Sequence, residues 1–423
     1  MQRKQRQKVM QQVLVIGGGV VGLSSAWWLV EAGYHVTLLE REPQVGVAAS
    51  YRNGGQLSYR YVAPLADSGV PLKGLQWMFQ KDSPLHFKLE ADPRQWSWLL
   101  QFLRNCNATD NRRTTAKLLE LGELSRRSMG QLGLTIPFEE FAWRDAGKLV
   151  VYRSREVFDA AVARPESEAT REVLTAAQCA EREPALRAAE HELAGGIFTR
   201  GEAVADCHAF CEALADRLKA HPRFGGIVRA EASRLIEKDG RISGVETNTG
   251  ALMADSFVLA AGVQSRNLAA TAGVRLPIYP LKGYSLTAPI GEQHCAPEIS
   301  VTDFERKTLY ARIGANLRVA AMVDIVGEDS RIDQRRIDSL QRIARGTMPH
   351  AADYDRAVPW AGLRPATPNS APILGRTRHA NLWLNVGHGP LGFTFACGTA
   401  AILAKLMQGS TLPFELGELR FQR

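Results

Sequence analysis

The sequence predicts an α/β fold, α+β overall, in which a parallel sheet with helices is interleaved with a second, antiparallel sheet. Three observations predict it. A strand, a glycine turn, a helix and a second strand follow one another within residues 13–40. Segments of the same character recur far along the chain, at 206–262 and 382–398. Between them lie stretches of different character, helical at 117–132 and strand-rich and aromatic at 279–326.

The N-terminal unit has the pattern of a nucleotide-binding turn. Residues 13–16 form a short β-branched run, typical of a buried parallel strand. The segment Gly17 to Gly22 fits G-x-G-x-x-G, and residues 23–32 predict a helix that Gly33 ends. Residues 35–40 predict a second strand that ends on an acidic residue, Glu40, 18 residues after Gly22.

Each part of this unit has a physical role. Gly17 allows a tight turn, Gly19 lets the backbone approach a pyrophosphate, and Gly22 permits close packing of helix on strand. The helix N-terminus offers free N–H groups to the phosphates. Glu40 accepts hydrogen bonds from ribose hydroxyls, and its charge disfavours a 2′-phosphate. The sequence therefore predicts a Rossmann-like dinucleotide site, because a glycine-rich core turn would leave Glu40 unexplained.

The later segments supply the rest of two interleaved domains. A helix is expected at 206–221 behind an acidic cap, a hairpin around Thr249-Gly250, and buried strands at 255–262 and 382–386. The nucleotide-binding domain is therefore expected to be discontinuous and to comprise residues 1–90, 195–272 and 350–423. A substrate domain, 91–194 and 273–349, is expected to be a sheet with helices that covers the ligand. Because both chain ends contribute to the nucleotide site, the ligand is expected to be long.

Composition limits the class of protein. The chain has 423 residues and a net charge of +8, half of which comes from Arg3, Lys4, Arg6 and Lys8. A length of this order suggests two or three compact units, and six cysteines are too few for a disulfide framework. The positive charge raises three alternatives, namely nucleic acid, an anionic membrane or acidic ligands. Basic residues interleaved with aromatic residues are absent outside the tail, which argues against nucleic acid.

Residues 13–30 are uncharged and follow the basic tail, which is also the layout of a secretory signal or a membrane anchor. Four glycines in this run and the lack of a small-residue cleavage site favour a cytoplasmic strand–turn–helix. No other uncharged apolar run of this length is evident in the sequence, and no membrane span is expected.

The nucleotide-binding unit, together with several later segments, resembles the FAD-dependent D-amino-acid oxidase superfamily, and within it the bacterial D-amino-acid dehydrogenases. The segments that carry the resemblance, beside Gly17 to Gly22 with Glu40, are Ser50 to Gln56, Val62 to Pro64, Pro71 to Lys73 with Trp77 to Phe79, Leu103 to Cys106, Tyr279 to Thr287, Gly362 to Pro365 with Thr367-Pro368, and Leu382 to Gly398. The chain departs from the pattern at Tyr51 and Arg52, where small residues are usual. It also has Pro390 where the dehydrogenases usually have threonine.

The resemblance implies FAD and the oxidation of an amino acid to an imino acid, which water hydrolyses to a 2-oxo acid and ammonia. It implies that the Asn53 loop and residues 387–394 border the flavin, and that Arg364 binds the substrate carboxylate. Electrons would pass to a quinone or another acceptor. An oxidase that produces peroxide, and a dehydrogenase for D-proline or hydroxyproline, remain alternatives.

Further residues are candidates for contact with the substrate. Tyr284 and Tyr310 have hydroxyls for the carboxylate or are core aromatics. Lys282 lies near the flavin or is solvated, and Arg52 is a second carboxylate clamp. His388 contacts the ring, accepts the amine proton or fills space. Hydride transfer to a flavin needs no general base at the carbon.

The expected cofactor contacts span the whole chain. They are Gly17, Gly19, Val20, Val21, Gly22, Glu40, Arg41, Ser50, Asn53, Gly54, Gly55, Gln56, Val228, Ala261, Gly262, Gly387, His388, Gly389, Leu391, Gly392 and Thr394. No metal is expected, because Cys207, His208 and Cys211 fall in one predicted helix without a fourth ligand. The protein is expected in the cytoplasm, with peripheral contact with the inner face of the membrane through the basic tail or the Trp-rich region as an alternative.

Overall fold

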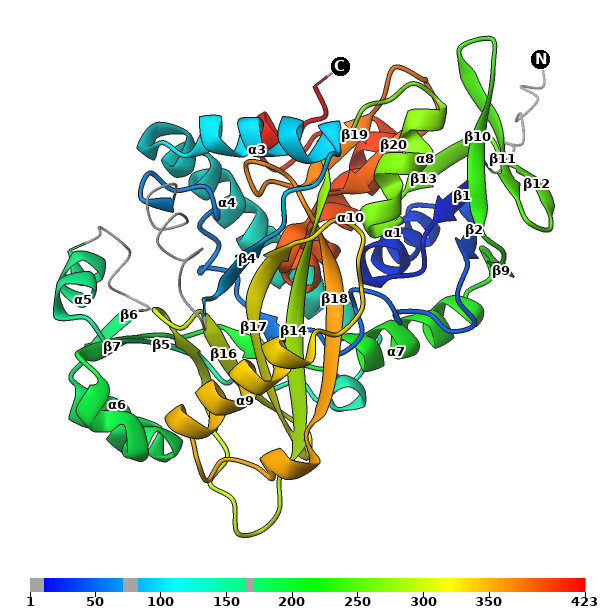
Figure 1. Cartoon of the computed structure of the whole chain (residues 1–423). Coiled ribbons are helices and arrows are strands. Elements are labelled where there is room, and N and C mark those ends of the chain that lie inside the picture. The colour runs from blue at the N-terminus through cyan, green and yellow to red at the C-terminus, as the bar shows by residue number, and fades with distance from the viewer. Residues whose placement is uncertain (1–10, 71–82, 164–170, 423) are drawn as a thin grey trace.

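A computed structural model describes residues 11–70, 83–163 and 171–422. It contains two large sheets that the chain enters repeatedly (Figure 1). The basic tail residues and the motifs Pro71 to Lys73 and Trp77 to Phe79 lie outside the described residues.

The first sheet has six strands and contains the glycine turn. In spatial order its strands are β19 (Ile373–Arg376), β20 (Leu382–Val386), β13 (Ser256–Leu259), β1 (Gln12–Ile16), β2 (His35–Glu40) and β9 (Phe224–Arg229). All neighbours are parallel except β19, which runs antiparallel to β20. Both faces of β1 are buried: Val13 and Val15 pack in one core cluster, Leu14 and Ile16 in another. Burial on both faces explains the uninterrupted apolar run.

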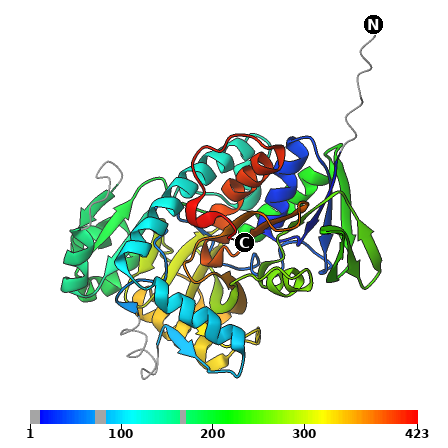
Figure 2. The ribbon, with the colours of Figure 1, turned by 90° about the horizontal axis from the view of Figure 1, so that it is seen from above.

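Helices cover one face of this sheet and a small sheet covers the other. The helices are α1 (Val20–Glu31), α7 (Cys207–Lys219), α10 (Gly392–Gln408) and α4 (Ala108–Leu132). On the other face lie α8 (Ser265–Thr271), β10 (Ala232–Lys238), β11 (Arg241–Thr247) and β12 (Gly250–Met253). Figure 2 shows α1, α10 and α4 side by side. Gly398 lets α10 approach α4 closely, since a Cβ there would lie 2.8 Å from Ser125.

The second sheet has nine strands. Its order is β18 (Val358–Ala366), β14 (Tyr279–Pro289), β17 (Asn316–Ile325), β16 (Thr308–Ile313), β15 (Ser300–Asp303), β5 (Lys148–Tyr152), β7 (Gly195–Thr199) and β6 (Arg171–Leu174), with β4 (Leu85–Phe87) beside β17. Helix α9 (Gln334–Thr347) packs Ile337 and Leu340 across one face (Figure 1). The pair β3 (Gln56–Leu57) and β8 (Ala203–Val204) lies apart from both large sheets.

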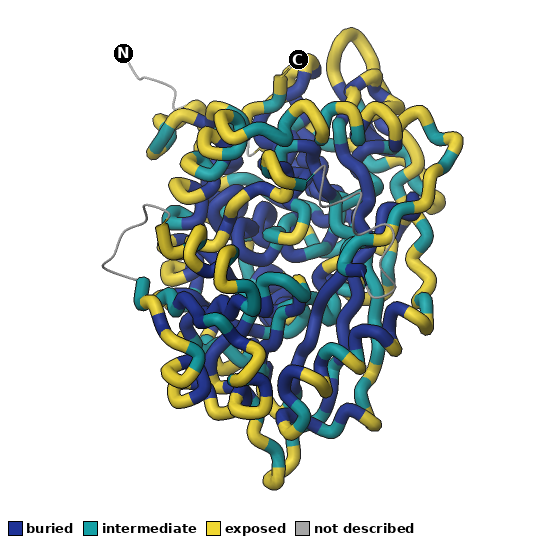
Figure 3. The backbone as a smooth tube through the Cα atoms, turned by 60° about the vertical axis from the view of Figure 1, so that its left-hand side comes forward, coloured by how far each residue is buried: buried dark blue, intermediate teal, exposed yellow. Residues whose placement is uncertain are grey.

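Further helices and 3-10 segments complete the described chain. They are the helices α3 (Pro93–Asn105), α5 (Arg155–Val162) and α6 (Ala176–Arg182) and the 3-10 segments Phe138–Phe141, Pro184–Glu192, Gly262–Gln264, Tyr354–Arg356, Gly389–Leu391 and Gly417–Leu419. Buried residues concentrate in the two sheets and in the helices beside them (Figure 3).

Three strands near the expected domain boundaries pair with the nine-stranded sheet. They are β4, β7 and β18, which fall inside the ranges 1–90, 195–272 and 350–423 that the sequence assigns to the nucleotide-binding domain. The division into two domains stays a proposal, and the strand pairing favours boundaries that place these three strands with the substrate domain. Strand β18 is not predicted from the sequence, because Pro359, Gly362 and Pro365 interrupt it. It lies at the edge of the sheet, where proline is tolerated.

The uncharged run 13–30 forms β1, the glycine turn and most of α1, which begins at Val20 and ends at Glu31. In the described part of the chain one helical stretch, Gly389–Gln408, is long and apolar enough to cross a bilayer, with a mean hydropathy of 1.4. Of this stretch, 67% is buried inside the protein. The stretch contains Lys405, so it is not a second uncharged run, and the expectation of no membrane span stays a prediction.

Candidate active site

The glycine turn after β1 leaves no room for side chains. Gly17 has φ +108°, and a Cβ there would lie 2.7 Å from the carbonyl oxygen of Ala260. A Cβ on Gly22 would overlap the carbonyl oxygen of Gly17. The turn and α1 are thereby held against the ends of β1 and β13, which is the packing that the spacing of these glycines predicts.

The N-terminus of α1 has Gly19 as its N-cap, which supplies no side-chain hydrogen bond. The N–H of Val20 donates to Ser50 Oγ at 3.0 Å. Glu40 Oε2 accepts from the N–H of Gly18 at 2.5 Å, and Oε1 accepts from the N–H of Glu42 at 2.8 Å. These bonds fix the Glu40 carboxylate at the end of β2, beside the positive end of the helix dipole.

A cavity of about 1970 Å³ runs from this turn to the nine-stranded sheet. That volume exceeds the usual range of roughly 300–1,000 Å³ for small-molecule sites, so it leaves room for a dinucleotide and a substrate. The expected cofactor residues that line it are Gly17, Gly19, Val20, Val21, Glu40, Arg41, Ser50, Asn53, Gly54, Gly55, Gln56, Ala261, Gly262, Gly387, His388, Gly389, Leu391 and Gly392.

Three expected cofactor residues do not line the cavity. Gly22 lies behind the turn, against Gly17, and Val228 lies in β9, paired with Leu39 of β2. The Thr394 hydroxyl accepts from the N–H of Ser58 at 3.2 Å. These three residues therefore stabilise the structure around the cavity and do not form its surface.

The loop 50–56 is fastened to the nine-stranded sheet through its backbone. Ser285 Oγ of β14 donates to the carbonyl of Arg52 at 2.7 Å, and Arg318 Nη1 of β17 donates to the carbonyl of Asn53 at 2.6 Å. Arg52 is left-handed, with φ +46°, which is costly for a residue with a side chain. Asn53 Oδ1 closes the turn by accepting from the N–H of Gly55 at 2.9 Å.

Arg364 projects from β18 into the cavity. Its guanidinium lies over Gly283 of β14, where any Cβ would overlap it, and Nη1 donates to the carbonyl of Met322 at 2.9 Å. Burial lowers the pKa of Arg364 to about 10, opposed by the Asp324 carboxylate, so the side chain stays charged at neutral pH. A guanidinium held in this way retains N–H groups for a two-pronged bond to a carboxylate.

Two glycines line the cavity beside Arg364. Gly283 and Gly362 are register partners in the pairing of β14 with β18. The Arg364 guanidinium covers the first, and the Trp360 ring covers the second, where a Cβ would overlap the indole. The cavity therefore has a cation and an aromatic wall side by side. Trp360 was not identified from the sequence. The signal for it was the Trp-x-Gly spacing, because residues two apart in an extended strand share a face and the ring can cover the glycine.

Lys282 does not line the cavity, and Tyr284 does line it but has its hydroxyl bound to a buried carboxylate. Strand β14 alternates its faces, with Leu281, Gly283 and Ser285 toward the cavity, while Tyr284 also packs in the core cluster that includes α9. The Tyr284 hydroxyl donates to Asp324 Oδ2 at 2.9 Å, and Lys282 Nζ donates to the carbonyl of Arg331 at 3.1 Å. Their expected contacts with substrate and flavin are not supported by this placement.

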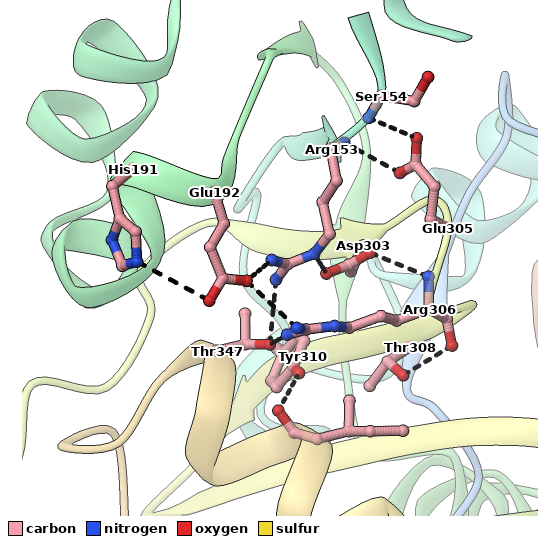
Figure 4. A network of polar contacts seen from close by, with 11 residues as sticks. Arg153, Ser154, His191, Glu192, Asp303, Glu305, Arg306, Thr308, Tyr310 and Thr347 are labelled. Carbon is pink, nitrogen blue, oxygen red and sulfur yellow. Dashed lines mark hydrogen bonds and ion pairs between the residues drawn. The ribbon is translucent and has the colours of Figure 1, made fainter. Parts of the chain in front are cut away.

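Tyr310 lies outside the cavity lining. Its hydroxyl faces α9, 3.5 Å from the carbonyl of Ile343 (Figure 4). Around it is a polar network in which Arg153 Nε donates to Asp303 Oδ2 at 2.7 Å and Arg306 Nη1 donates to Thr347 Oγ1 at 2.8 Å. This position agrees with the prediction of Tyr310 as a core aromatic residue. It does not agree with the prediction that its hydroxyl donates to the substrate carboxylate.

His388 lines the cavity but is 3% exposed. Its Nε2 lies 3.1 Å from Thr399 Oγ1, and that hydroxyl donates to the carbonyl of Ala396. Burial lowers the pKa of His388 to about 3, which keeps the imidazole neutral at physiological pH. An acceptor of the amine proton needs a pKa near the working pH, so this placement argues against that role.

Lys148 of β5 is a buried cation on the cavity wall that was not identified from the sequence. Its Nζ donates to Gln56 Oε1 at 2.6 Å and to Ser58 Oγ at 3.1 Å, and lies 4.6 Å from the centre of the Tyr61 ring. Burial lowers its pKa to about 8, opposed by Glu202. The signal in the sequence was a lysine at the first position of an otherwise apolar strand, 148–152, which indicates a buried cation.

Metal binding has no support in the residues described. These contain no group of three or more His, Cys, Asp or Glu side chains placed to hold an ion. His208 lies edge-on to the Tyr51 ring, with centroids 5.0 Å apart.

Comparison with known proteins extends what the geometry indicates. Residues 12–406 match the family described as FAD dependent oxidoreductase. The chain belongs to this family. The glycine turn, the N-terminus of α1 behind Gly19 and the long cavity fit FAD, and Glu40 is placed for the ribose.

Relatives of the chain cover nearly its whole length. It is 49% identical over 395 residues to D-amino acid dehydrogenase 2 of Pseudomonas aeruginosa, covering 93% of this chain and 94% of the relative. It is 44% identical over 409 residues to D-amino acid dehydrogenase 2 of Ralstonia nicotianae, covering 94% and 96%.

Solved structures share the fold at lower identity. Glycine oxidase from Bacillus cereus superposes with a TM-score of 0.71 at 19% identity, covering 97% of both chains. L-proline dehydrogenase from P. horikoshii gives 0.73 at 16% identity, covering 97% of this chain and 96% of that one. The α/β fold with FAD as cofactor, predicted from the sequence, is confirmed.

Proposed function

We propose that this flavoenzyme oxidises a D-amino acid to an imino acid, which water hydrolyses to the 2-oxo acid and ammonia. The observation that carries the proposal is the Arg364 guanidinium, held over Gly283 in the same cavity as the glycine turn and residues 387–392. The glycine turn and residues 387–392 would hold FAD, which would supply the hydride acceptor for the α-hydrogen. The names of the relatives support the D-amino-acid class.

The residues of the chain bind and orient the substrate. Arg364 holds the α-carboxylate through two N–H groups, which fixes the position of the α-carbon. Trp360 bounds the space beside it. His388 stays neutral and buried, and shapes the cavity wall. Clamping and orientation are the contributions that hydride transfer requires from the protein.

The test is an anaerobic titration of the purified protein with D- and L-amino acids, including proline and hydroxyproline. We expect flavin absorption that bleaches with D-amino acids and persists with their L-enantiomers. A colourless preparation that FAD does not reconstitute, or bleaching by L-enantiomers alone, would contradict the proposal. Bleaching by D-proline or hydroxyproline alone would favour the narrower alternative.

The electron acceptor belongs to the same proposal. A quinone or another acceptor is expected in place of oxygen, in line with the dehydrogenase names of the relatives. Measuring peroxide formed per substrate consumed in air separates the two. A yield near zero with rapid turnover on a soluble quinone supports a dehydrogenase, and a stoichiometric yield identifies an oxidase.

A further inference from the structure

The cavity wall holds more cations without an ion pair than one α-carboxylate requires. Arg52, Lys148 and Arg364 all line it, and none of them forms an ion pair within 4.0 Å among the residues described. Lys148 is engaged by Gln56 and Ser58, and Arg364 by the carbonyl of Met322. The Arg52 guanidinium instead lies over the Tyr51 ring, 5.1 Å from its centre, which leaves its N–H groups for a ligand.

All six acidic side chains that line the cavity have partners elsewhere. Glu40 accepts from the nucleotide turn, Glu305 accepts from the N–H of Arg153, and Glu328 pairs with Arg266. Glu42 and Glu231 pair with Arg41, and Asp67 accepts from the N–H of Ser68. Arg318 is 6% exposed and forms no ion pair within 4.0 Å among the residues described, and the Asp206 carboxylate offsets part of its charge. The cations without an ion pair therefore favour an anion at this end of the cavity.

Contacts along β14 bring the two arginines to the same part of the cavity. Ser285, which donates to the Arg52 carbonyl, and Gly283, over which the Arg364 guanidinium lies, are two residues apart on the same face of the strand. Two residues of strand span about 7 Å. The Arg52 backbone and the Arg364 guanidinium therefore contact β14 one strand repeat apart, which allows both arginines to act on one ligand.

We propose that Arg52 binds the side-chain carboxylate of an acidic D-amino acid, while Arg364 holds the α-carboxylate. This assignment rests on the proposed function and narrows its substrate class to D-glutamate and D-aspartate. The left-handed backbone of Arg52 supports it, because strain at a ligand-facing position persists only where the surroundings enforce it. Ser285 and Arg318 enforce it here.

Kinetics of the holoenzyme test the assignment with D-glutamate and D-glutamine, which have nearly the same size and differ in charge. The wild type is expected to prefer D-glutamate by at least about 10-fold in kcat/KM, from a charge-assisted bond. Arg52→Ala, which restores a small residue, should lower kcat/KM for D-glutamate about 100-fold and leave D-glutamine within about 3-fold. Arg52→Lys should recover part of the loss.

Ligand binding without turnover gives an independent readout. Calorimetry with glutarate, a five-carbon dicarboxylate, and with butyrate should show tighter binding of glutarate to the wild type. In Arg52→Ala the two should bind alike, and in Arg335→Ala, an exposed control in α9, the difference should persist.

The outcomes separate this assignment from the proposed function. If D-glutamine and D-alanine reduce the flavin and D-glutamate has no advantage, Arg52 is not an acid-binding residue and the proposed function stands. If no D-amino acid reduces the flavin, the proposed function fails. Equal affinity for glutarate and butyrate in the wild type then overturns the dicarboxylate site as well.

Discussion

Gly283 decides whether Arg364 can enter the cavity. A methyl group at this position would occupy the place of the guanidinium. Gly283→Ala is therefore expected to lower kcat/KM for the best D-amino acid about 100-fold, the loss of a charge-assisted carboxylate bond. Steady-state kinetics measure the effect. FAD content should stay unchanged, because Gly283 does not belong to the glycine turn.

Gly346→Ala is the matched control for this variant. Gly346 lies in α9, and a Cβ there would meet nothing within 4 Å. Gly346 is the next-to-last residue of this helix, where alanine is favoured over glycine by less than the roughly 1 kcal/mol of a helix interior, so this variant should keep wild-type kinetics and a similar or slightly higher Tm. Equal kinetic losses in both variants would show that Gly283 has no special relation to Arg364.

His388 makes the stability of the protein depend on pH. Its pKa of about 3 in the folded state lies below the ordinary value near 6.5. Between these values the unfolded chain binds a proton that the folded chain does not, so stability falls as pH falls through this window. The loss approaches about 1.4 kcal/mol per pH unit.

Urea unfolding of wild type and His388→Gln at pH 7 and pH 5 measures this contribution. The wild type is expected to lose about 2 kcal/mol more than the variant over that interval. Parallel losses in both proteins would mean that His388 becomes protonated in the folded state.

Single residues differ in how far the sequence could identify them. Arg364 was identifiable because the Gly-Leu-Arg-Pro segment carries the resemblance, and its placement in the cavity agrees with that reading. Tyr284 sits in an equally distinctive segment, yet the alternation of β14 turns it to α9. The face on which an alternating strand presents each residue depends on its partners, which the sequence does not state.

Two strands of the nine-stranded sheet bind the backbone of the loop 50–56. Arg318 of β17 and Ser285 of β14 bind successive carbonyls of the loop 50–56. Arg318→Met should release the Asn53 carbonyl and weaken FAD binding about 10-fold, as expected for a hydrogen bond from a charged donor. Fluorescence titration of the apoprotein with FAD measures this change.

Arg312→Met is the comparison for that variant. Arg312 lies on β16 and pairs with the exposed Glu298. Surface ion pairs contribute about 0–1 kcal/mol, and this one does not reach the loop. Its FAD affinity should equal that of the wild type, and an equal loss in both variants would assign the effect to general destabilisation of the sheet.

Helices α7 and α1 have caps and glycines nearby in the sequence and could be predicted from them. The edge strand β18 has no such local signal and could not be predicted. Helix α7 begins behind Asp206, whose carboxylate accepts from the N–H groups of His208 and Ala209, as the acidic cap predicts. Helix α1 starts three residues earlier than expected, because Val20 follows the Gly19 N-cap directly. Strand β18 depends on long-range pairing with β14, which overrides its two prolines.

At the scale of the whole molecule, half of the net charge of +8 belongs to the tail that holds Arg3, Lys4, Arg6 and Lys8. The cytoplasmic location stays a proposal from the glycine-rich run 13–30, and the proposed peripheral contact with an anionic membrane surface rests on the charge of this tail. Deletion of residues 1–10 should move the protein from the membrane fraction to the soluble fraction at low salt. Unchanged fractionation would show that the tail is not the anchor.

Both chain ends contribute to the six-stranded sheet: β1 and β2 open the chain, and β20 with α10 comes near its end. The cavity lining follows the same pattern, since it includes Gly17 and Gly392. Because 375 positions separate these two glycines in the sequence, the cavity is complete only once α10 has packed beside the glycine turn. Loss of α10 would therefore be expected to open the FAD site at the opposite end of the chain.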